Sequence, residues 1–295
     1  MFSQRTPSPF QKRKSQDNEL SYAERISVNQ LTTLRSTVDE DLKSYAAMSI
    51  PGIGLSCRKL YDTLPNQLIQ DIRQSGLQVS SLGWIGAFTG FNGHPRCQAV
   101  QEAKQTIKLA ARLGCRVVTV LSGPQAGHIT SHARRLLVES LQTLLPLAES
   151  CGVDLALMPM HPKFEDQWSF LTTLAEVQAI IKQVGHRRLG LCFSTYHSCH
   201  ESGLVDRLAS LARDIKLVQV ADWAREPRCA NSRAMPGEGI LRLPEMIQAL
   251  EQAGYRGWYE LDVWCRENWK RDQEEVLREG VNAMLELGAL LDVPS

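Results

Sequence analysis

The sequence predicts an α/β protein, a single closed (β/α)8 barrel, from three observations. Short apolar runs of strand length alternate eight times with longer segments of helical periodicity. Glycines such as Gly114, Gly152 and Gly254 close helical patterns just before the next strand, as residues after a helix C-terminus commonly do. The 295 residues with 43% apolar content are enough for one barrel core. Because strict alternation implies parallel strands, eight units are expected to close on themselves.

Each expected element follows from its own pattern. The strands are the short apolar runs at 25–29, 52–56, 78–82, 116–121, 153–158, 189–193, 216–220 and 258–262. The helices are the periodic segments at 39–47, 64–74, 95–113, 129–151, 167–184, 203–213, 243–253 and 273–291. An open doubly wound sheet is the alternative, but no Gly-x-Gly-x-x-Gly turn follows the first strand.

Composition limits the partners and the cell compartment. Lys and Arg (33) nearly cancel Asp and Glu (32), so no charge excess is available to hold nucleic acid. No apolar stretch approaches the roughly 20 residues of a membrane span, and no signal-peptide pattern follows Met1. The eight cysteines are scattered without a Cys-x-x-Cys pair. We therefore expect a soluble cytoplasmic protein with reduced thiols and no membrane contact, and leave a homo-oligomer open.

The N-terminal segment differs from the rest of the chain. Residues 1–24 are rich in Gln, Ser, Pro, Lys and Arg and contain few large apolar side chains. Such a segment buries too little apolar surface to offset the entropy lost on ordering. We expect a disordered or extended tail at 1–24 and a single barrel domain at 25–295.

The alternation of side chains along each strand predicts which of them face the barrel centre. Outward positions must be large and apolar to meet the helices. This places Leu155 and Leu157 outside and Met158 inside. By the same parity, the last inward positions of the sixth, seventh and eighth strands are Ser194, Gln219 and Asp262, with Glu260 one inward position deeper.

Polar and aromatic residues gather in the loops just above these positions. The polar ones are His161, His197, Asp222, Arg233 and Glu238, and the tryptophans are Trp84, Trp168, Trp223 and Trp264. Loops are polar on any barrel, so each residue alone is equally consistent with a structural role. Their convergence on the C-terminal end of the barrel favours a small-molecule site.

Motifs at these residues resemble those of the xylose-isomerase-like barrel superfamily, and within it the sugar-phosphate isomerase/epimerase group, over about 25–291. The motifs are Ser27-Val-Asn-Gln30, Leu155-Ala-Leu-Met-Pro-Met-His-Pro162, Thr195-Tyr-His197, Val218-Gln-Val-Ala-Asp-Trp223, Arg233-x-x-Pro-Gly-Glu-Gly239 and Gly254-Tyr-x-Gly-Trp-Tyr-Glu-Leu-Asp262. The resemblance implies a divalent metal held by Glu, Asp, His or Gln, and Glu on the fifth to eighth strands.

The four positions that the resemblance assigns to the metal read Met158, Ser194, Gln219 and Asp262. A thioether is a poor ligand for Mg²⁺ or Mn²⁺, and a serine hydroxyl brings no charge. We therefore expect no cofactor, with weak Mn²⁺ or Mg²⁺ binding through Asp262 as the most that the site allows. A substitute metal site built from His161, Glu260 and Asp262 is the alternative.

The resemblance and the residues together predict an isomerase- or epimerase-like barrel with a polyhydroxylated or carbonyl, sugar-like ligand. The expected acid and base groups are His197, His161, Asp262 and Glu260, and the expected substrate-binding groups are Asp222, Arg233, Glu238, Trp223 and Gln219. One alternative is a non-catalytic binding or partner protein on the same fold. Another is an apurinic-site endonuclease, which is disfavoured because it needs a metal-binding cluster and a basic face.

Overall fold

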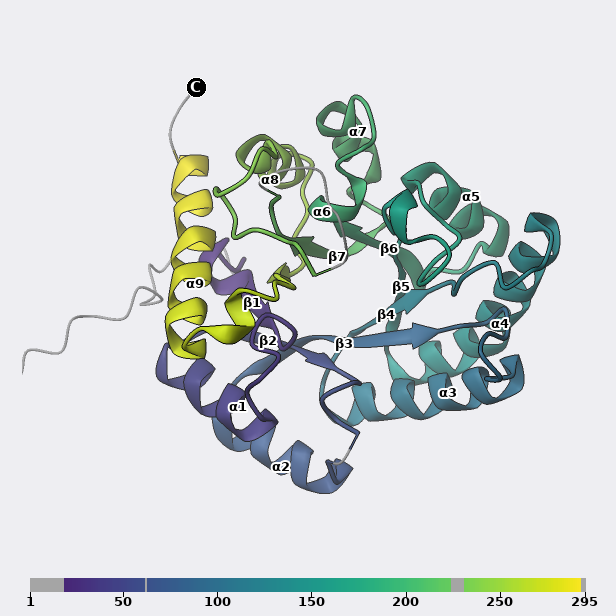
Figure 1. Cartoon of the computed structure of the whole chain (residues 1–295), viewed down its shortest axis with the longest axis horizontal. Coiled ribbons are helices and arrows are strands. Elements are labelled where there is room, and N and C mark those ends of the chain that lie inside the picture. The colour runs from purple at the N-terminus through teal and green to yellow at the C-terminus, as the bar shows by residue number, and fades with distance from the viewer. Residues whose placement is uncertain (1–18, 62, 224–230, 293–295) are drawn as a thin grey trace, which may run out of the picture.

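Eight parallel strands close into one barrel in the computed structural model, which describes residues 19–61, 63–223 and 231–292 (Figure 1). The strands are β1 Ile26–Asn29, β2 Gly52–Ser56, β3 Gln78–Gly86, β4 Val117–Leu121, β5 Asp154–Leu157, β6 Leu189–Ser194, β7 Ile215–Val220 and β8 Tyr259–Leu261. Each pairs with its neighbours in sequence, and β1 pairs with β8 to complete the ring. The predicted fold class is confirmed.

Helices surround this barrel on all sides (Figure 1). They are α1 Val38–Ala47, α2 Pro65–Ser75, α3 Arg96–Arg112, α4 Thr130–Cys151, α5 Leu174–Val184, α6 Thr195–Ser198, α7 Leu204–Leu211, α8 Leu243–Gln252 and α9 Gln273–Ala289. Short 3-10 turns lie at η1 Ala23–Arg25, η2 Pro162–Phe164, η3 Asn268–Lys270 and η4 Leu290–Asp292.

Two helices differ from the prediction. The helix expected from 167 begins at Leu174, because Thr173 and Glu176 form a capping box that fixes the start there. Helix α6 was not predicted, since a single turn is too short to show a periodic pattern. It begins where the Ser194 hydroxyl accepts the His197 N–H at 3.4 Å.

The barrel separates two apolar cores. Leu155, Leu157 and Phe193 belong to the large core between strands and helices. Met158 and Cys192 belong to a smaller core inside the barrel. The predicted parity of the fifth and sixth strands is thus confirmed, and it is strongly specified because a one-residue slip would exchange the two faces.

The residues just before Arg25 contact the barrel. Of the predicted tail, residues 1–18 lie outside the described residues, but 19–24 are described. The Tyr22 ring packs against Tyr259 with 4.8 Å between ring centroids. Arg25 donates to the carbonyls of Leu20 and Ser21. The segment from 19 onward is therefore part of the barrel body.

The seven cysteines in the described part of the chain are free, and Cys229 lies outside it. Among the described residues, no helix combines the length and the apolar character that crossing a bilayer requires.

Candidate functional site

A small cavity lies inside the C-terminal mouth of the barrel. Its lining includes Ser56, Met158, Gln219, Arg233 and Asp262, from β2, from the ends of β5, β7 and β8, and from the loop after β7. Its volume of about 20 Å³ is enough for one water, which needs roughly 10–15 Å³. Pockets for small organic ligands are roughly 300–1,000 Å³, so this cavity by itself does not hold one.

Three tryptophans roof this cavity. The ring of Trp84 stacks on that of Trp264 at 5.5 Å and meets Trp168 edge-on at 5.3 Å. All three line the cavity. The predicted aromatic mouth is therefore formed by Trp84, Trp168 and Trp264, whereas Trp223 lines a different pocket beside α7 and α8.

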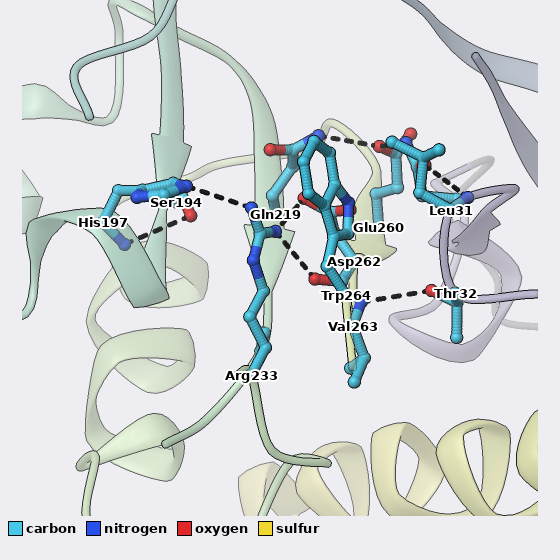
Figure 2. A network of polar contacts seen from close by, with 12 residues as sticks. Leu31, Thr32, Ser194, His197, Gln219, Arg233, Glu260, Asp262, Val263 and Trp264 are labelled. Carbon is cyan, nitrogen blue, oxygen red and sulfur yellow. Dashed lines mark hydrogen bonds and ion pairs between the residues drawn. The ribbon is translucent and has the colours of Figure 1, made fainter. Parts of the chain in front are cut away.

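Arg233 is the centre of the polar network at the mouth (Figure 2). Its guanidinium donates to the Asp262 carboxylate at 2.5 Å and to the Asp262 carbonyl at 2.9 Å. A second nitrogen donates to Nε2 of His197 at 3.0 Å. The guanidinium carbon lies 4.5 Å from the Trp264 ring centroid and 5.0 Å from that of Tyr196. Only 2% of Arg233 is exposed, so this cation is held entirely by protein groups.

His197 is neutral in this environment. Burial, followed by the nearby Arg233 charge, lowers the pKa of His197 well below its ordinary value of 6.5. Both ring nitrogens face donors, namely Arg233 and, at 3.3 Å, the backbone N–H of His161. A neutral imidazole has one nitrogen with a free lone pair. Because the contact from Arg233 is the shorter one and its donor is charged, Nε2 is the nitrogen that accepts. While that contact stands, Nε2 cannot take a proton from a ligand.

Glu260 lies deeper and is fully buried. One carboxylate oxygen accepts from Asn29 at 2.8 Å and Gln219 at 3.0 Å, and the other accepts from Ser80 at 2.8 Å and Ser81 at 2.6 Å. All four donors are neutral. Burial therefore raises the pKa of Glu260, although these hydrogen bonds oppose the rise.

The remaining predicted site residues lie away from the cavity. The Asp222 carboxylate accepts the backbone N–H groups of Trp223, Gly237, Gly239 and Leu241 at 2.8–3.1 Å. It therefore holds the loop that follows β7. Glu238 is exposed and accepts from a backbone N–H within the same loop. No contact with the cavity supports substrate binding by Asp222, Trp223 or Glu238, which stays a prediction.

His161 is buried behind His197 rather than at the cavity. Its ring lies 4.9 Å from that of His200 and 6.0 Å from that of Trp223, and its Nδ1 accepts the backbone N–H of Lys163. It does not line the cavity. The structure thus joins Gln219 to Glu260, and Asp262 and His197 to Arg233, through side-chain hydrogen bonds, and His161 contacts this set through its backbone N–H on His197.

The residues at the expected metal position do not suit a divalent cation. Met158 and Ser194 offer no charge, and the Asp262 carboxylate is engaged by Arg233 and by the Trp264 indole at 2.6 Å. Among the described residues, no group of three or more His, Cys, Asp and Glu side chains is arranged to hold a metal.

Four buried polar atoms around the cavity lack hydrogen-bond partners among the described residues. They are Oγ of Ser56, Nε1 of Trp168, Oε1 of Gln219 and Nε of Arg233. Buried polar groups are nearly always satisfied, and each exception calls for an explanation. Two of the four are donors, one is an acceptor and the hydroxyl can be either.

Sequence reasoning missed Asn29 and Ser56, which contribute to the cavity from the first two strands. Both are polar residues at the C-terminal ends of their strands. That position was a usable signal. Both residues lie outside the fifth to eighth strands, for which the inward positions were predicted.

The barrel and its mouth define a class of protein, a (β/α)8 barrel with a polar ligand-type site at the carboxyl ends of its strands. The pattern described as "xylose isomerase-like TIM barrel" matches residues 46–287. The chain belongs to this family.

Relatives with named activities are distant. A 3-dehydroshikimate dehydratase of Pseudomonas aeruginosa is 24% identical over 246 residues, which cover 79% of this chain but only 37% of that protein. A putative hydroxypyruvate isomerase of Homo sapiens is 26% identical, covering 72% of this chain and 83% of that protein. The crystal structure of IOLI protein with a binding zinc atom superposes with a TM-score of 0.80 at 19% identity, covering 90% of this chain and 98% of that one. The last similarity shows the fold alone.

Proposed function

We propose that this protein binds a small polyhydroxylated or carbonyl compound at its C-terminal mouth, as an isomerase- or epimerase-like member of its family. The observation that carries this proposal is the set of four unpartnered polar atoms around one cavity. Each costs about 1–3 kcal/mol while it stays unsatisfied. A ligand with hydroxyl and carbonyl groups supplies both the acceptors that Arg233 and Trp168 need and the donor that Gln219 needs.

A ligand larger than one water must displace part of the tryptophan roof. Trp168 is the best candidate to move, because it lies between η2 and α5 in a segment without helix or strand. Its ring is only half-buried, and its indole nitrogen is unpartnered. Binding is therefore expected to change the indole environment, which tryptophan fluorescence reports directly.

Binding is tested with a panel of pentoses, hexoses, inositols and small keto compounds, followed by tryptophan fluorescence and by melting temperature. Ser56→Ala removes one unpartnered hydroxyl from the cavity and is expected to weaken binding about fivefold, as loss of one hydrogen bond of about 1 kcal/mol would. Ser27→Ala is the matched control, because its buried hydroxyl is also unpartnered but does not line the cavity. Equal effects of the two variants, or no response to any compound, would reject the proposal.

A non-catalytic binding protein is the second candidate, favoured by one observation. Isomerisation needs a group free to move a proton between carbons, yet His197, Glu260 and Asp262 are already hydrogen-bonded within the protein. Incubation of a bound compound in deuterated water separates the two. Deuterium incorporation next to the carbonyl, seen by NMR, supports an isomerase or epimerase, and binding without exchange supports the second candidate.

A further inference from the structure

A second, larger pocket lies beside the small cavity of the mouth, and we call the two the outer pocket and the inner cavity. The outer pocket lies where the end of β3 meets α3, and its lining includes Ile85, Gly86, Ala99, Ala103 and Thr106 from these two elements (Figure 1). Its volume is about 380 Å³. This volume is within the range of pockets that hold small organic molecules, roughly 300–1,000 Å³.

The inner cavity and the outer pocket share part of their lining. Trp84, Leu121 and Trp168 line both of them. The Trp168 ring meets that of Trp84 edge-on at 5.3 Å, and its indole nitrogen is buried without a partner among the described residues. The backbone of this residue is held, because the Trp168 N–H donates to the Phe164 carbonyl at 3.0 Å. We expect a rotation of the Trp168 side chain, with its backbone in place, to join the two spaces.

The outer pocket is mostly apolar. Besides the two tryptophans, its lining includes Cys57, Ile85 and Phe91. Burial raises the pKa of the Cys57 thiol to about 11, so this side chain is uncharged at neutral pH. Aromatic and aliphatic side chains of this kind stabilise a ring or an alkyl chain by removing it from water.

The charges around the two spaces do not suit an anion. The polar residues that line the outer pocket are His94, Glu102, Thr106 and Gln167, with no lysine or arginine among the described residues. Nε2 of His94 lies 3.2 Å from the Glu102 carboxylate. In the inner cavity, Arg233 is the only described cation, and it already pairs with Asp262. A phosphate group would therefore lose water without gaining a free countercharge, which is unfavourable.

We propose that the ligand of this barrel is an uncharged compound in two parts, a sugar or polyol that carries an aryl or alkyl substituent. The hydroxylated or carbonyl part faces the unpartnered polar atoms of the inner cavity, in the space that Trp168 vacates. The substituent lies in the outer pocket, against Phe91 and the apolar face of α3. This ligand class rests on the proposed function and narrows it.

The affinity for each hexose is measured by calorimetry for three forms, the free sugar, its phenyl glycoside and its 6-phosphate. We expect the phenyl glycoside to bind at least about tenfold more tightly than the free sugar, because burial of a phenyl ring supplies at least that factor. The 6-phosphate is expected to bind no better than the free sugar. Equal affinities of the free sugar and the phenyl glycoside, or a preference for the phosphate, would overturn the proposal and leave the proposed function standing. If none of the compounds binds, both are rejected.

The position of the substituent is tested with two matched variants. Thr106→Phe fills the outer pocket and is expected to abolish the difference between phenyl glycoside and free sugar. Thr143→Phe is the control, because Thr143 lies at an exposed position of α4 and lines neither space. Both hydroxyls donate to the carbonyl four residues earlier, at 3.1 Å for Thr106 and 2.8 Å for Thr143. An equal preference for the phenyl glycoside in the two variants contradicts the proposal.

Saturation-transfer NMR on the unmodified protein gives the same information without a variant. The phenyl protons are expected to receive at least as much saturation as the sugar ring protons, since both parts of the ligand are enclosed. A phenyl ring that receives much less saturation than the sugar remains in solvent, and that result also overturns the proposal.

Discussion

Two carboxylates near the end of β8 have different partners, neutral side chains for Glu260 and a cation for Asp262. Glu260 points to the deep centre and accepts only from the neutral side chains of Asn29, Ser80, Ser81 and Gln219. Asp262, two residues on, is at the mouth and pairs with the Arg233 guanidinium. Burial raises the pKa of Glu260, which favours its protonated form. Of these two carboxylates, the one at the mouth has a countercharge because the loop after β7 delivers Arg233 there.

Removing the countercharge at the mouth should have the largest effect on stability. Arg233→Met leaves Asp262 buried without its cation, which costs about 3–5 kcal/mol of unfolding free energy. Adding Asp262→Leu should recover most of that loss, because apolar replacement of both partners of a buried pair is often nearly neutral. Urea denaturation measures both. If Arg233→Met cost less than about 1 kcal/mol, this buried pair would contribute no more to stability than an exposed ion pair does.

Crowding the deep centre tests the other carboxylate. A Cβ on Gly54 would lie against the Glu260 carboxylate, so Gly54→Ala forces this side chain to shift. We expect a loss of about 1–3 kcal/mol, as is usual for overpacking. Combining it with Glu260→Asp, one methylene shorter, should recover part of the loss. A strictly additive double variant would show that the two residues do not compete for space.

The pH dependence at the mouth follows from His197. Its folded pKa lies well below 6.5, so below pH 6.5 the unfolded chain takes up a proton that the folded protein does not. Stability is therefore lost as pH falls below 6.5, at up to about 1.4 kcal/mol per pH unit. His197→Gln should flatten this slope in urea titrations between pH 6.5 and 5. His186→Gln, at a position that is more exposed, serves as the control.

The deep centre should show the smaller and opposite pH effect. The folded pKa of Glu260 is raised above 4.5, so its contribution to stability is complete below pH 4.5 and is lost as pH rises through the folded value. Glu260→Gln removes this loss but disturbs one hydrogen bond, a cost of about 1 kcal/mol. The free energy of unfolding of the variant, relative to that of the unmodified protein, should therefore be most favourable at the highest pH. A difference that does not change with pH would contradict the raised pKa.

Much of the fold could be predicted from the sequence, because strand parity and strand–helix alternation are visible within short stretches of the chain. Leu155 and Met158 took the predicted sides, because large apolar side chains are stabilised by about 1.5–3 kcal/mol when they face the helices. The start of α5 was missed because residues 167–173 carry a helix-like pattern. Tertiary contacts override that pattern: the Phe170 N–H donates to the Gly123 carbonyl, and Ser169 bonds Ser122.

The site was predictable as a set of residues but not as a set of contacts. Parity placed Gln219, Glu260 and Asp262 inside, and the structure brings them to one region. It could not show that Arg233, eleven residues after Asp222, turns back into the mouth while Asp222 turns toward its own loop. The direction of a side chain in a long loop depends on contacts such as that of Arg233 with Trp264, which lies on a different strand end.

The position of Arg233 means that the chain itself supplies a positive charge at the mouth. A metal ion reaches its site by mass action, so occupancy depends on the free ion concentration and on competing ions. A guanidinium carried on the loop after β7 is present once per chain and has no dissociation constant of its own. Its arrival is coupled to the folding of that loop, which Asp222 fixes through four backbone amides. The conditions that govern assembly of the mouth are therefore those that govern the loop.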